Sequence, residues 1–414
     1  MNNIRQRENQ ILFFSTIMLG VIVGISSLLL SILLDMTEKI FLAFQESVKQ
    51  PVATTVLPEQ RLVSVLLGGM IAAIIWWYLR TKFKPTISIN KALTGQQMPP
   101  IQTAIHVMTQ IFYVGTGGSI GKELAPREAG VMLSQLWERL LQRLKLNLSK
   151  DDQQLLLAAA AGAGFAGVYS APLTGMLFCV EMLLKKVSKK IVLVSLTMSS
   201  ISMMIGTLVK GFGPYYRVGS QYFSFKFLIL VIIVAPLCGL VGGLFRNAFK
   251  KAGQARTNKN SILWQLPVVA FLTGLISLVF PQIMGNGRAL AQLAIDTTSR
   301  KLIWLLLLGA ILKVIVTILT IKSGASGGTI TPSIAVGAAL GAILGLSLQS
   351  FLPNISIWQC SILGGCSLLA ASQQAPLMAL MMLFEISHLN YSAILPLGLG
   401  VTIAVAMSNF IVKK

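Results

Sequence analysis

The sequence predicts an all-α integral membrane protein, and three observations support this fold class. Of the 414 residues, 54% are hydrophobic and only 11% are charged, and the mean hydropathy of +0.75 is far above that of a soluble domain. Apolar stretches long enough to cross a hydrocarbon core of about 30 Å recur from end to end. Other stretches are short or interrupted by Gly and Pro, which is typical of helices broken around a cavity inside a membrane protein.

Seven apolar stretches are expected to span the membrane, and they cover residues 11–34, 62–78, 191–209, 227–245, 262–280, 302–321 and 393–412. The first is too long in its apolar part for an ordinary cleaved signal peptide, so we interpret it as a membrane helix. The stretches lack the period-two alternation of a membrane β-barrel. We therefore expect residues 1–414 to form a single transmembrane domain of roughly ten or more helical segments in the lipid bilayer.

The net charge of +21 is concentrated in connections beside the apolar stretches, at residues 80–84, 139–145, 185–190, 250–259 and 413–414. The positive-inside rule assigns these connections, including a basic one at 245–260, to the cytoplasm. The connection at 35–59 mixes acids with few bases and is expected outside. These assignments predict a multi-pass protein of the cell membrane with both termini cytoplasmic. The same rule explains the charge without a nucleic-acid partner, because the basic loops lack interleaved aromatic residues.

No residue pattern indicates a metal, a cofactor or an enzyme. The chain has no paired carboxylates, no His/Asp cluster and no nucleophile motif. His106 and His388 are too far apart in the sequence to form a metal motif. The four cysteines lie singly within apolar stretches and are expected to be packing residues; they are Cys179, Cys238, Cys360 and Cys366.

Two pairs of matching segments indicate an internal repeat. GKELAP (121–126) matches GGTITP (327–332), and GVYSAPLTGMLFCVE (167–181) matches ASQQAPLMALMMLFE (371–385). The spacings agree, with 45 residues from Pro126 to Ala171 and 43 from Pro332 to Ala375. We infer two homologous halves, at about 61–210 and about 261–412. Similarity alone leaves parallel and inverted orientations open, although inverted repeats commonly bring two broken-helix motifs together near the membrane midplane.

The glycine-rich motifs favour binding of a small anion. A glycine turn that leads into a helix presents backbone N–H groups and the positive end of the helix dipole. Two such turns could replace the hydration of a monovalent anion without binding it too tightly for release. Glu123 could compete with that anion when ionised and withdraw when protonated. The alternative is that Glu123 only complements a helix N-terminus, but the matching residue in the second half is Thr329.

These residues carry a resemblance to a known family. GKELAPREAG resembles the gating-glutamate motif of the CLC chloride channel and transporter family, Gly-Arg/Lys-Glu-Gly-Pro, and GGTITPSIAVGAALG resembles its Gly-x-Phe-x-Pro motif. The resemblance extends from about residue 10 to the C-terminus. It implies a homodimer of subunits built from two inverted-topology repeats with broken and re-entrant helices, each subunit with its own pore and bound chloride or another halide. It also implies that Glu123 is the gate and that the anion meets the backbone of Gly121, Lys122, Gly328, Thr329 and Ile330.

The sequence departs from the family pattern at several positions. Residues 84–86 read Lys-Pro-Thr where the family has a Gly-Ser motif, and Ile330 replaces a phenylalanine. Glu181 matches the first of a family acidic pair, whereas Met182 replaces the second, which usually relays protons. The C-terminal helix with a pore tyrosine is also missing.

We therefore expect transport of small monovalent anions, chloride foremost, through a glutamate-gated pore, and the departures favour proton-independent conduction. A proton-coupled antiporter of chloride or fluoride, with Glu181 on the proton path, stays open as the alternative. A carrier of another, larger solute is a third interpretation. The residues favour transport over catalysis in each case.

Overall fold

The chain folds into helices joined by short connections. The computed structural model describes residues 2–257, 260–352 and 355–412, and within these ranges it contains sixteen α-helices and no β-strand. The helices are α1 (Asn2–Leu42), α2 (Pro58–Lys82), α3 (Ile89–Leu93), α4 (Pro100–Gly115), α5 (Leu124–Arg143), α6 (Lys150–Tyr169), α7 (Pro172–Leu177), α8 (Lys189–Lys210), α9 (Leu228–Gln254), α10 (Ile262–Val279), α11 (Arg288–Asp296), α12 (Ile303–Lys322), α13 (Ile330–Leu348), α14 (Ile357–Gln373), α15 (Pro376–Ile386) and α16 (Ile394–Val412). A π-helical segment, η1 (Phe178–Leu184), continues α7. The predicted all-α class is confirmed.

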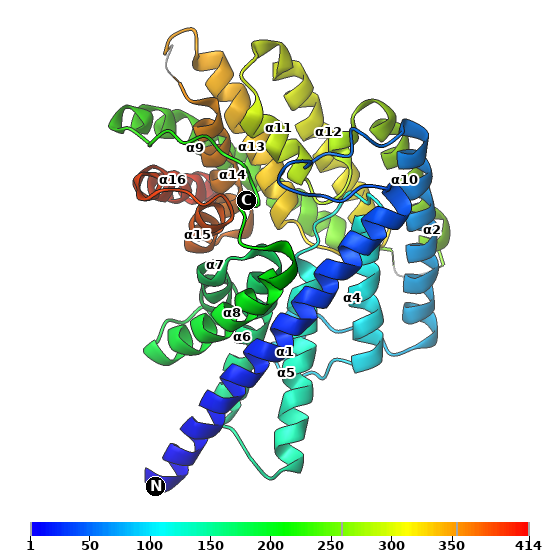
Figure 1. Ribbon diagram of the computed structural model, residues 1–414, viewed down its shortest axis with the longest axis vertical. Helices are drawn as coiled ribbons and strands as arrows, with labels where there is room; N and C mark the ends of the chain where they lie inside the picture. Colours follow the sequence, from blue (N-terminus) through cyan, green and yellow to red (C-terminus); the bar gives the residue numbers. More distant parts are fainter. Residues whose placement is uncertain (1, 258–259, 353–354, 413–414) are drawn as a thin grey trace. The chain divides into compact units, whose positions relative to one another are not determined.

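The helices are grouped into two compact units, which we describe separately. Unit 1 comprises Met1–Leu33, Tyr78–Ile111 and Glu123–Gly213, and unit 2 comprises Leu34–Trp77, Phe112–Lys122 and Pro214–Lys414. Helices α1, α2 and α4 each pass from one unit into the other (Figure 1). The repeat boundaries predicted from the sequence follow a different criterion and stay a prediction.

Among the residues that the structure describes, eight helices are long and apolar enough to cross a membrane. Seven of them coincide with the stretches predicted from the sequence, which confirms a multi-pass membrane protein. The eighth, Ile330–Leu348, escaped prediction because small residues dilute its apolar character. The predicted loop at 35–59 is shorter than expected, because α1 continues to Leu42 and α2 begins at Pro58. Asp35, Thr37 and Glu38 are buried helix residues, so these two acids do not mark a loop.

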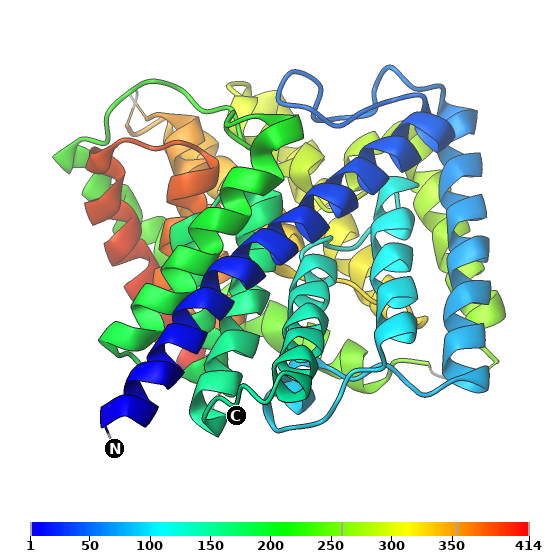
Figure 2. The same ribbon diagram turned by 60° about the horizontal axis from the view of Figure 1, so that its bottom comes forward.

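Small residues allow close helix packing inside unit 1. Helix α5 meets α6 at Gly130, where a Cβ would lie 2.2 Å from the Ala160 carbonyl oxygen, and at Gly164, where a Cβ would lie 2.1 Å from the Pro126 carbonyl oxygen. Helix α1 lies across α8, and Gly20 contacts Ile201 there (Figure 2). Close backbone approach at small residues is a common means of packing membrane helices.

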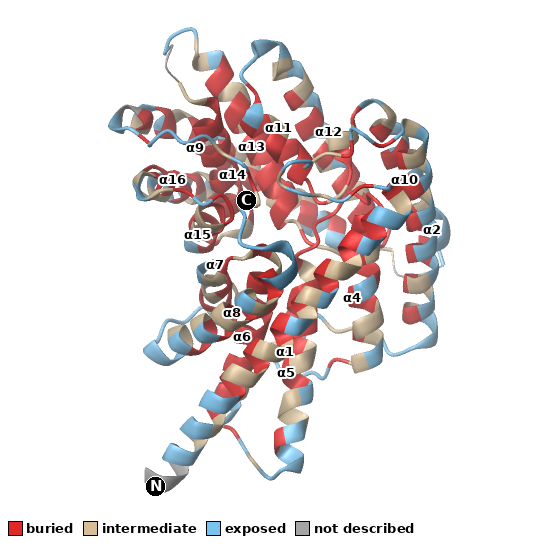
Figure 3. Ribbon diagram, viewed as in Figure 1, coloured by how far each residue is buried: buried red, intermediate tan, exposed pale blue. Residues whose placement is uncertain are grey.

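Close backbone approach at small residues also joins the two central helices of unit 2. Helices α13 and α14 are buried along almost their whole length (Figure 3). A Cβ on Gly337 would lie 2.4 Å from the Gly364 carbonyl oxygen, and a Cβ on Gly364 would lie 2.3 Å from the Gly337 carbonyl oxygen. The pair α13–α14 therefore repeats the packing chemistry of α5–α6 in the other half of the sequence.

The two Ala-Pro-Leu segments adopt the same backbone conformation in their respective units. In unit 1, α6 ends at Ser170, which has a left-handed φ of 56°, and α7 begins at Pro172. In unit 2, α14 ends at Gln374, with φ 55°, and α15 begins at Pro376. Each proline occupies the first helical position, where the missing N–H costs no intrahelical bond. A helix is thus broken at matching positions of the two repeats.

Candidate functional site

The glycine-rich motifs of both repeats meet within unit 2. The Gly121 N–H donates to the Gly328 carbonyl at 2.9 Å, and the Gly328 N–H donates to the Gly121 carbonyl at 2.8 Å. Thr329 is the N-cap of α13, which begins at Ile330. The structure therefore brings together the candidate residues Gly121, Lys122, Gly328, Thr329 and Ile330.

This pairing assigns a structural task to the two glycines. The N–H of each glycine donates to the carbonyl of the other, so Gly121 and Gly328 link the two motifs directly. The positive end of the α13 dipole lies at Ile330, which is 1% exposed. A buried helix N-terminus of this kind stabilises a negative charge.

A buried lysine fixes the turn that precedes Gly121. Lys313 of α12 is fully buried, and its Nζ donates to Ser119 Oγ at 2.9 Å, to the Gly285 carbonyl at 2.7 Å and to the Ile283 carbonyl at 3.1 Å. An ammonium group has three N–H donors, and these three oxygens match them. Lys313 was not predicted as a site residue, although a lysine inside an apolar stretch is itself a signal of a positioned charge.

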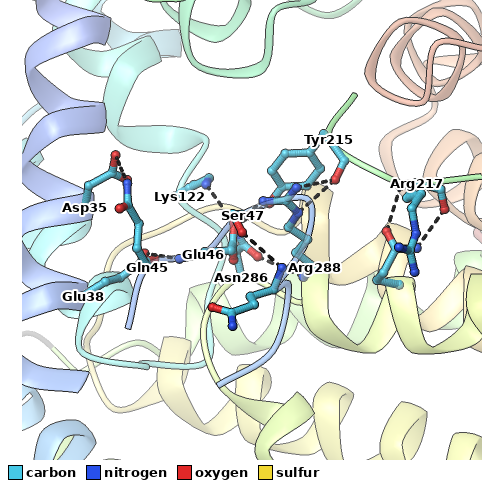
Figure 4. Close-up of polar contacts among 12 residues, drawn as sticks. Asp35, Glu38, Gln45, Glu46, Ser47, Lys122, Tyr215, Arg217, Asn286 and Arg288 are labelled. Atoms are coloured by element: carbon cyan, nitrogen blue, oxygen red, sulfur yellow. Dashed lines mark hydrogen bonds and ion pairs between the residues drawn. The ribbon is translucent and has the colours of Figure 1, made fainter. Parts of the chain in front are cut away.

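Lys122 lies in a cluster of polar side chains drawn from distant parts of unit 2 (Figure 4). It is 3% exposed, and its Nζ lies 3.5 Å from Glu46 Oε1 and 5.3 Å from the centre of the Tyr215 ring. Arg288 Nη1 lies 3.2 Å from the same Glu46 oxygen. Burial lowers the pKa of Arg288, but the Glu46 carboxylate and the tyrosine more than offset this effect, so the pKa lies above its ordinary value. Arg288 is therefore a permanent cation beside Lys122.

Glu123, the predicted gate, is a fully buried carboxylate in unit 1. It is the N-cap of α5, but its side chain makes no capping hydrogen bond to that helix. Arg127 fixes the local backbone, because its Nε donates to the Glu123 carbonyl at 2.6 Å and its guanidinium lies 5.0 Å from the centre of the Phe178 ring. This geometry weighs against the interpretation that Glu123 only caps a helix.

Glu128, on the first turns of α5, has different neighbours from Glu123. Its Oε2 accepts a hydrogen bond from Gln110 Nε2 at 2.6 Å and lies 3.5 Å from His106 Nε2. His106 therefore contacts a carboxylate within the packed interior of unit 1.

Glu181, the candidate for a proton path, lies half-buried in the π-helical segment η1. The matching Glu385 of the second repeat lies instead in the regular helix α15. The two acids therefore sit in different backbone environments despite their matching sequence positions. Single π-helical turns within α-helices are frequent at functional sites.

Within the described part of the chain, no group of three or more His, Cys, Asp or Glu residues could hold a metal ion. All four cysteines are free and buried. The predicted packing role of the cysteines is confirmed.

Broken helices that begin at Pro, repeated glycine turns and buried charges define a transport-type membrane protein with an internal repeat. The chain matches the sequence profile of the family described as "Voltage gated chloride channel" over residues 68–409. Since this match covers most of the chain, the protein belongs to the voltage-gated chloride channel, or CLC, family. The family resemblance inferred from the two motifs is confirmed.

Curated relatives match most of their own length with this chain. The chain is 29% identical over 307 residues to a protein named "Putative chloride channel protein ClcB-like" from Ralstonia nicotianae, covering 72% of this chain and 70% of the relative. It is 27% identical over 352 residues to "Voltage-gated ClC-type chloride channel ClcB" of Escherichia coli (strain K12 / DH10B), covering 81% of each chain.

Solved structures have the same fold. A "slow cyanobacterial Cl-/H+ antiporter" aligns with a TM-score of 0.82 and 20% identity over 96% of this chain and 94% of its own. A "CLC-type fluoride/proton antiporter" aligns with a TM-score of 0.65 and 19% identity over 98% of this chain and 95% of its own. These likenesses confirm the predicted fold class of inverted repeats with broken helices.

Proposed function

We propose that the protein transports small monovalent anions, with chloride foremost, through a pathway gated by Glu123. Two relatives are named as chloride channel proteins and two structural neighbours as halide/proton antiporters, which supports a halide as the transported ion. The observation that carries the proposal is Glu123 itself, a fully buried residue whose carboxylate makes no capping hydrogen bond to α5. An ionisable side chain buried inside a membrane protein is a functional candidate by default.

Replacement of Glu123 by Gln tests the gate. A neutral amide cannot act as a tethered anion, so Glu123→Gln should keep anion flux and lose its pH dependence. The measurement is chloride, fluoride and larger-anion efflux from liposomes across a pH series. Glu59→Gln, the same change at an exposed position, is the matched control and should keep the wild-type profile. A wild-type pH profile in Glu123→Gln would overturn the gate, and flux of larger solutes alone would favour a carrier.

Proton coupling is the second candidate function. The structural neighbours are described as antiporters, and Glu181 occupies a π-helical segment, both of which favour exchange. Met182 favours passive conduction, because a thioether cannot carry a proton. Between these, we propose passive conduction, and the reversal potential described in the Discussion distinguishes the two.

The family also supports an assembly and an orientation. We propose a homodimer with one pathway per subunit, as the resemblance implies, and cytoplasmic termini, as the basic connections favour. The anion itself is the only bound species that the proposal requires.

A further inference from the structure

Three donors in unit 2 converge on a single carboxylate oxygen, Glu46 Oε1 (Figure 4). Arg288 Nη1 lies 3.2 Å away, the Tyr215 hydroxyl 3.4 Å and Lys122 Nζ 3.5 Å. Charge-assisted N–H···O contacts usually measure about 2.7–2.9 Å, and O–H···O contacts about 2.5–3.0 Å. Every one of these contacts is longer, so the three donors form a cup that is wide for an oxygen atom. A larger monatomic acceptor, such as a halide, fits that width better.

Two of the three donors, Arg288 and Tyr215, are held in place without help from Glu46. The Arg288 guanidinium donates twice to the Tyr215 carbonyl, from Nε at 2.9 Å and from Nη2 at 2.6 Å, and it lies 4.1 Å from the centre of the Tyr215 ring. Asn286 Nδ2 donates to the Tyr215 hydroxyl at 2.9 Å, which leaves the hydroxyl proton directed to Glu46. The Tyr215 N–H is bonded to the Ile386 carbonyl. Such a preorganised set of donors persists when its acceptor leaves.

Glu46 reaches the cup from a connection that lacks regular structure. It lies in residues 43–57, and its side chain is 16% exposed, whereas the side chains of Lys122 and Arg288 are 4% and 6% exposed. The next residues, from Ser47 to Gln50, form an exposed turn. The carboxylate is therefore more exposed than either of the two cations that face it.

The surrounding charges favour an anion once Glu46 is withdrawn. Two cations, Lys122 and Arg288, face Glu46, and Glu38 of α1 accepts the Glu46 N–H at 2.8 Å. Asp35 is bonded to Gln45 Nε2 at 3.0 Å. A cavity of about 40 Å³, large enough for water, borders Glu38 and Glu46 and extends to Gly115 and Gly117 of the first glycine motif. The cavity thus places Glu46, the acceptor in the cup, beside the segment that leads along the chain to Glu123.

We propose that Lys122, Arg288 and Tyr215 form a halide-binding seat at the first glycine motif, and that the Glu46 carboxylate fills this seat when no halide is bound. Glu46 is then a second, tethered competitor of the transported ion, supplied by a different part of the chain from the gate. The seat itself stands on the cluster geometry, while its place on the transport pathway rests on the proposed function.

Bromide, whose anomalous scattering locates it in a crystal, is the probe. Crystals of Glu46→Ala grown in bromide should show an anomalous peak between Lys122 Nζ and Arg288 Nη1, and this peak should disappear in Glu46→Ala/Lys122→Met. Crystals of Glu59→Ala should lack the peak, because Glu46 still fills the seat. If Glu46→Ala does not fold, the same crystals are grown with Glu46→Gln, because a neutral amide should not compete with bromide for the seat. Folded protein without bromide at this position in either Glu46 variant would overturn the seat.

Flux through liposomes separates the seat from the proposed function. A tethered carboxylate competes at an effective concentration in the millimolar range, so Glu46→Ala should lower the halide concentration for half-maximal flux by about tenfold. Glu59→Ala should leave it unchanged. If the half-maximal concentration is unchanged in Glu46→Ala while the bromide peak is present, the seat binds halide but does not lie on the transport pathway. Absence of wild-type halide flux would refute the proposed function but leave the crystallographic result standing.

Discussion

The glycine contact between α13 and α14 offers a sharp test of how the core of unit 2 is packed. A Cβ added at Gly364 would lie 2.3 Å from the Gly337 carbonyl oxygen, 2.8 Å from Gly341 Cα and 2.9 Å from Gly341 N. All three atoms belong to backbone, so no side chain can rotate away. Gly364→Ala must push the two helices apart.

The expected cost follows from this geometry. Overpacking a close-packed core by one methyl group costs about 1–3 kcal/mol. With an unfolding entropy of about 2 cal/mol/K per residue, a cooperative transition of the whole chain would fall in Tm by about 1–4 °C. Ala has a higher helix propensity than Gly by about 0.5–1 kcal/mol, which offsets part of this loss.

Gly398 of α16 provides a matched control, because Gly398→Ala is expected to leave the Tm unchanged or to raise it. A Cβ there would meet only Leu380 Cδ1, at an ordinary 3.5 Å, so Gly398→Ala gains helix propensity without a clash. Thermal unfolding of the two purified variants, followed by intrinsic fluorescence, should place Gly364→Ala below and Gly398→Ala at or above the wild-type Tm. A Gly364→Ala protein as stable as Gly398→Ala would show that this glycine contact does not limit helix approach.

Two further predictions concern topology and coupling. All four native cysteines are buried, so a membrane-impermeant maleimide should leave them unmodified, and a cysteine added after Lys414 should be labelled only when the cytoplasmic face is open; labelling from outside intact cells would refute the orientation. With opposed chloride and pH gradients across a liposome, passive conduction should reverse at the anion equilibrium potential whatever the pH gradient. A shift with pH that Glu181→Gln abolishes would overturn passive conduction and place Glu181 on a proton path.

Membrane helices and repeat motifs were predictable because their signals are local. An apolar run of about 20 residues identifies a span wherever it occurs. Matching Ala-Pro-Leu segments predicted equivalent positions in the two halves, and the helices break there, at Ser170 and Gln374. Neither residue is a glycine, so the left-handed conformation itself carried no sequence signal.

The cluster around Glu46 could not be predicted, because it is formed by residues that are far apart in the sequence. Its members, Glu46, Lys122, Tyr215 and Arg288, come from four separate segments, and only the fold brings them together. Lys122 alone was singled out, from its place beside Glu123. The acidic stretch at 35–59 was interpreted as a loop because acids are rare inside membranes, whereas here Asp35 and Glu38 are buried on α1.

The buried cations raise a question for any anion pathway, because an exposed positive charge would hold a halide too tightly for release. An anion pathway therefore requires that nearby cations do not bind the halide too tightly. The two lysines near the first glycine motif, Lys313 and Lys122, meet this requirement in different ways. Lys313 directs its three N–H donors to three neutral oxygens, so it acts on an anion only through its field. Lys122 faces the Glu46 carboxylate, which in the seat proposed above would be exchanged for a halide. Competition between the tethered carboxylate and the halide would then keep the ion from being held too tightly for release.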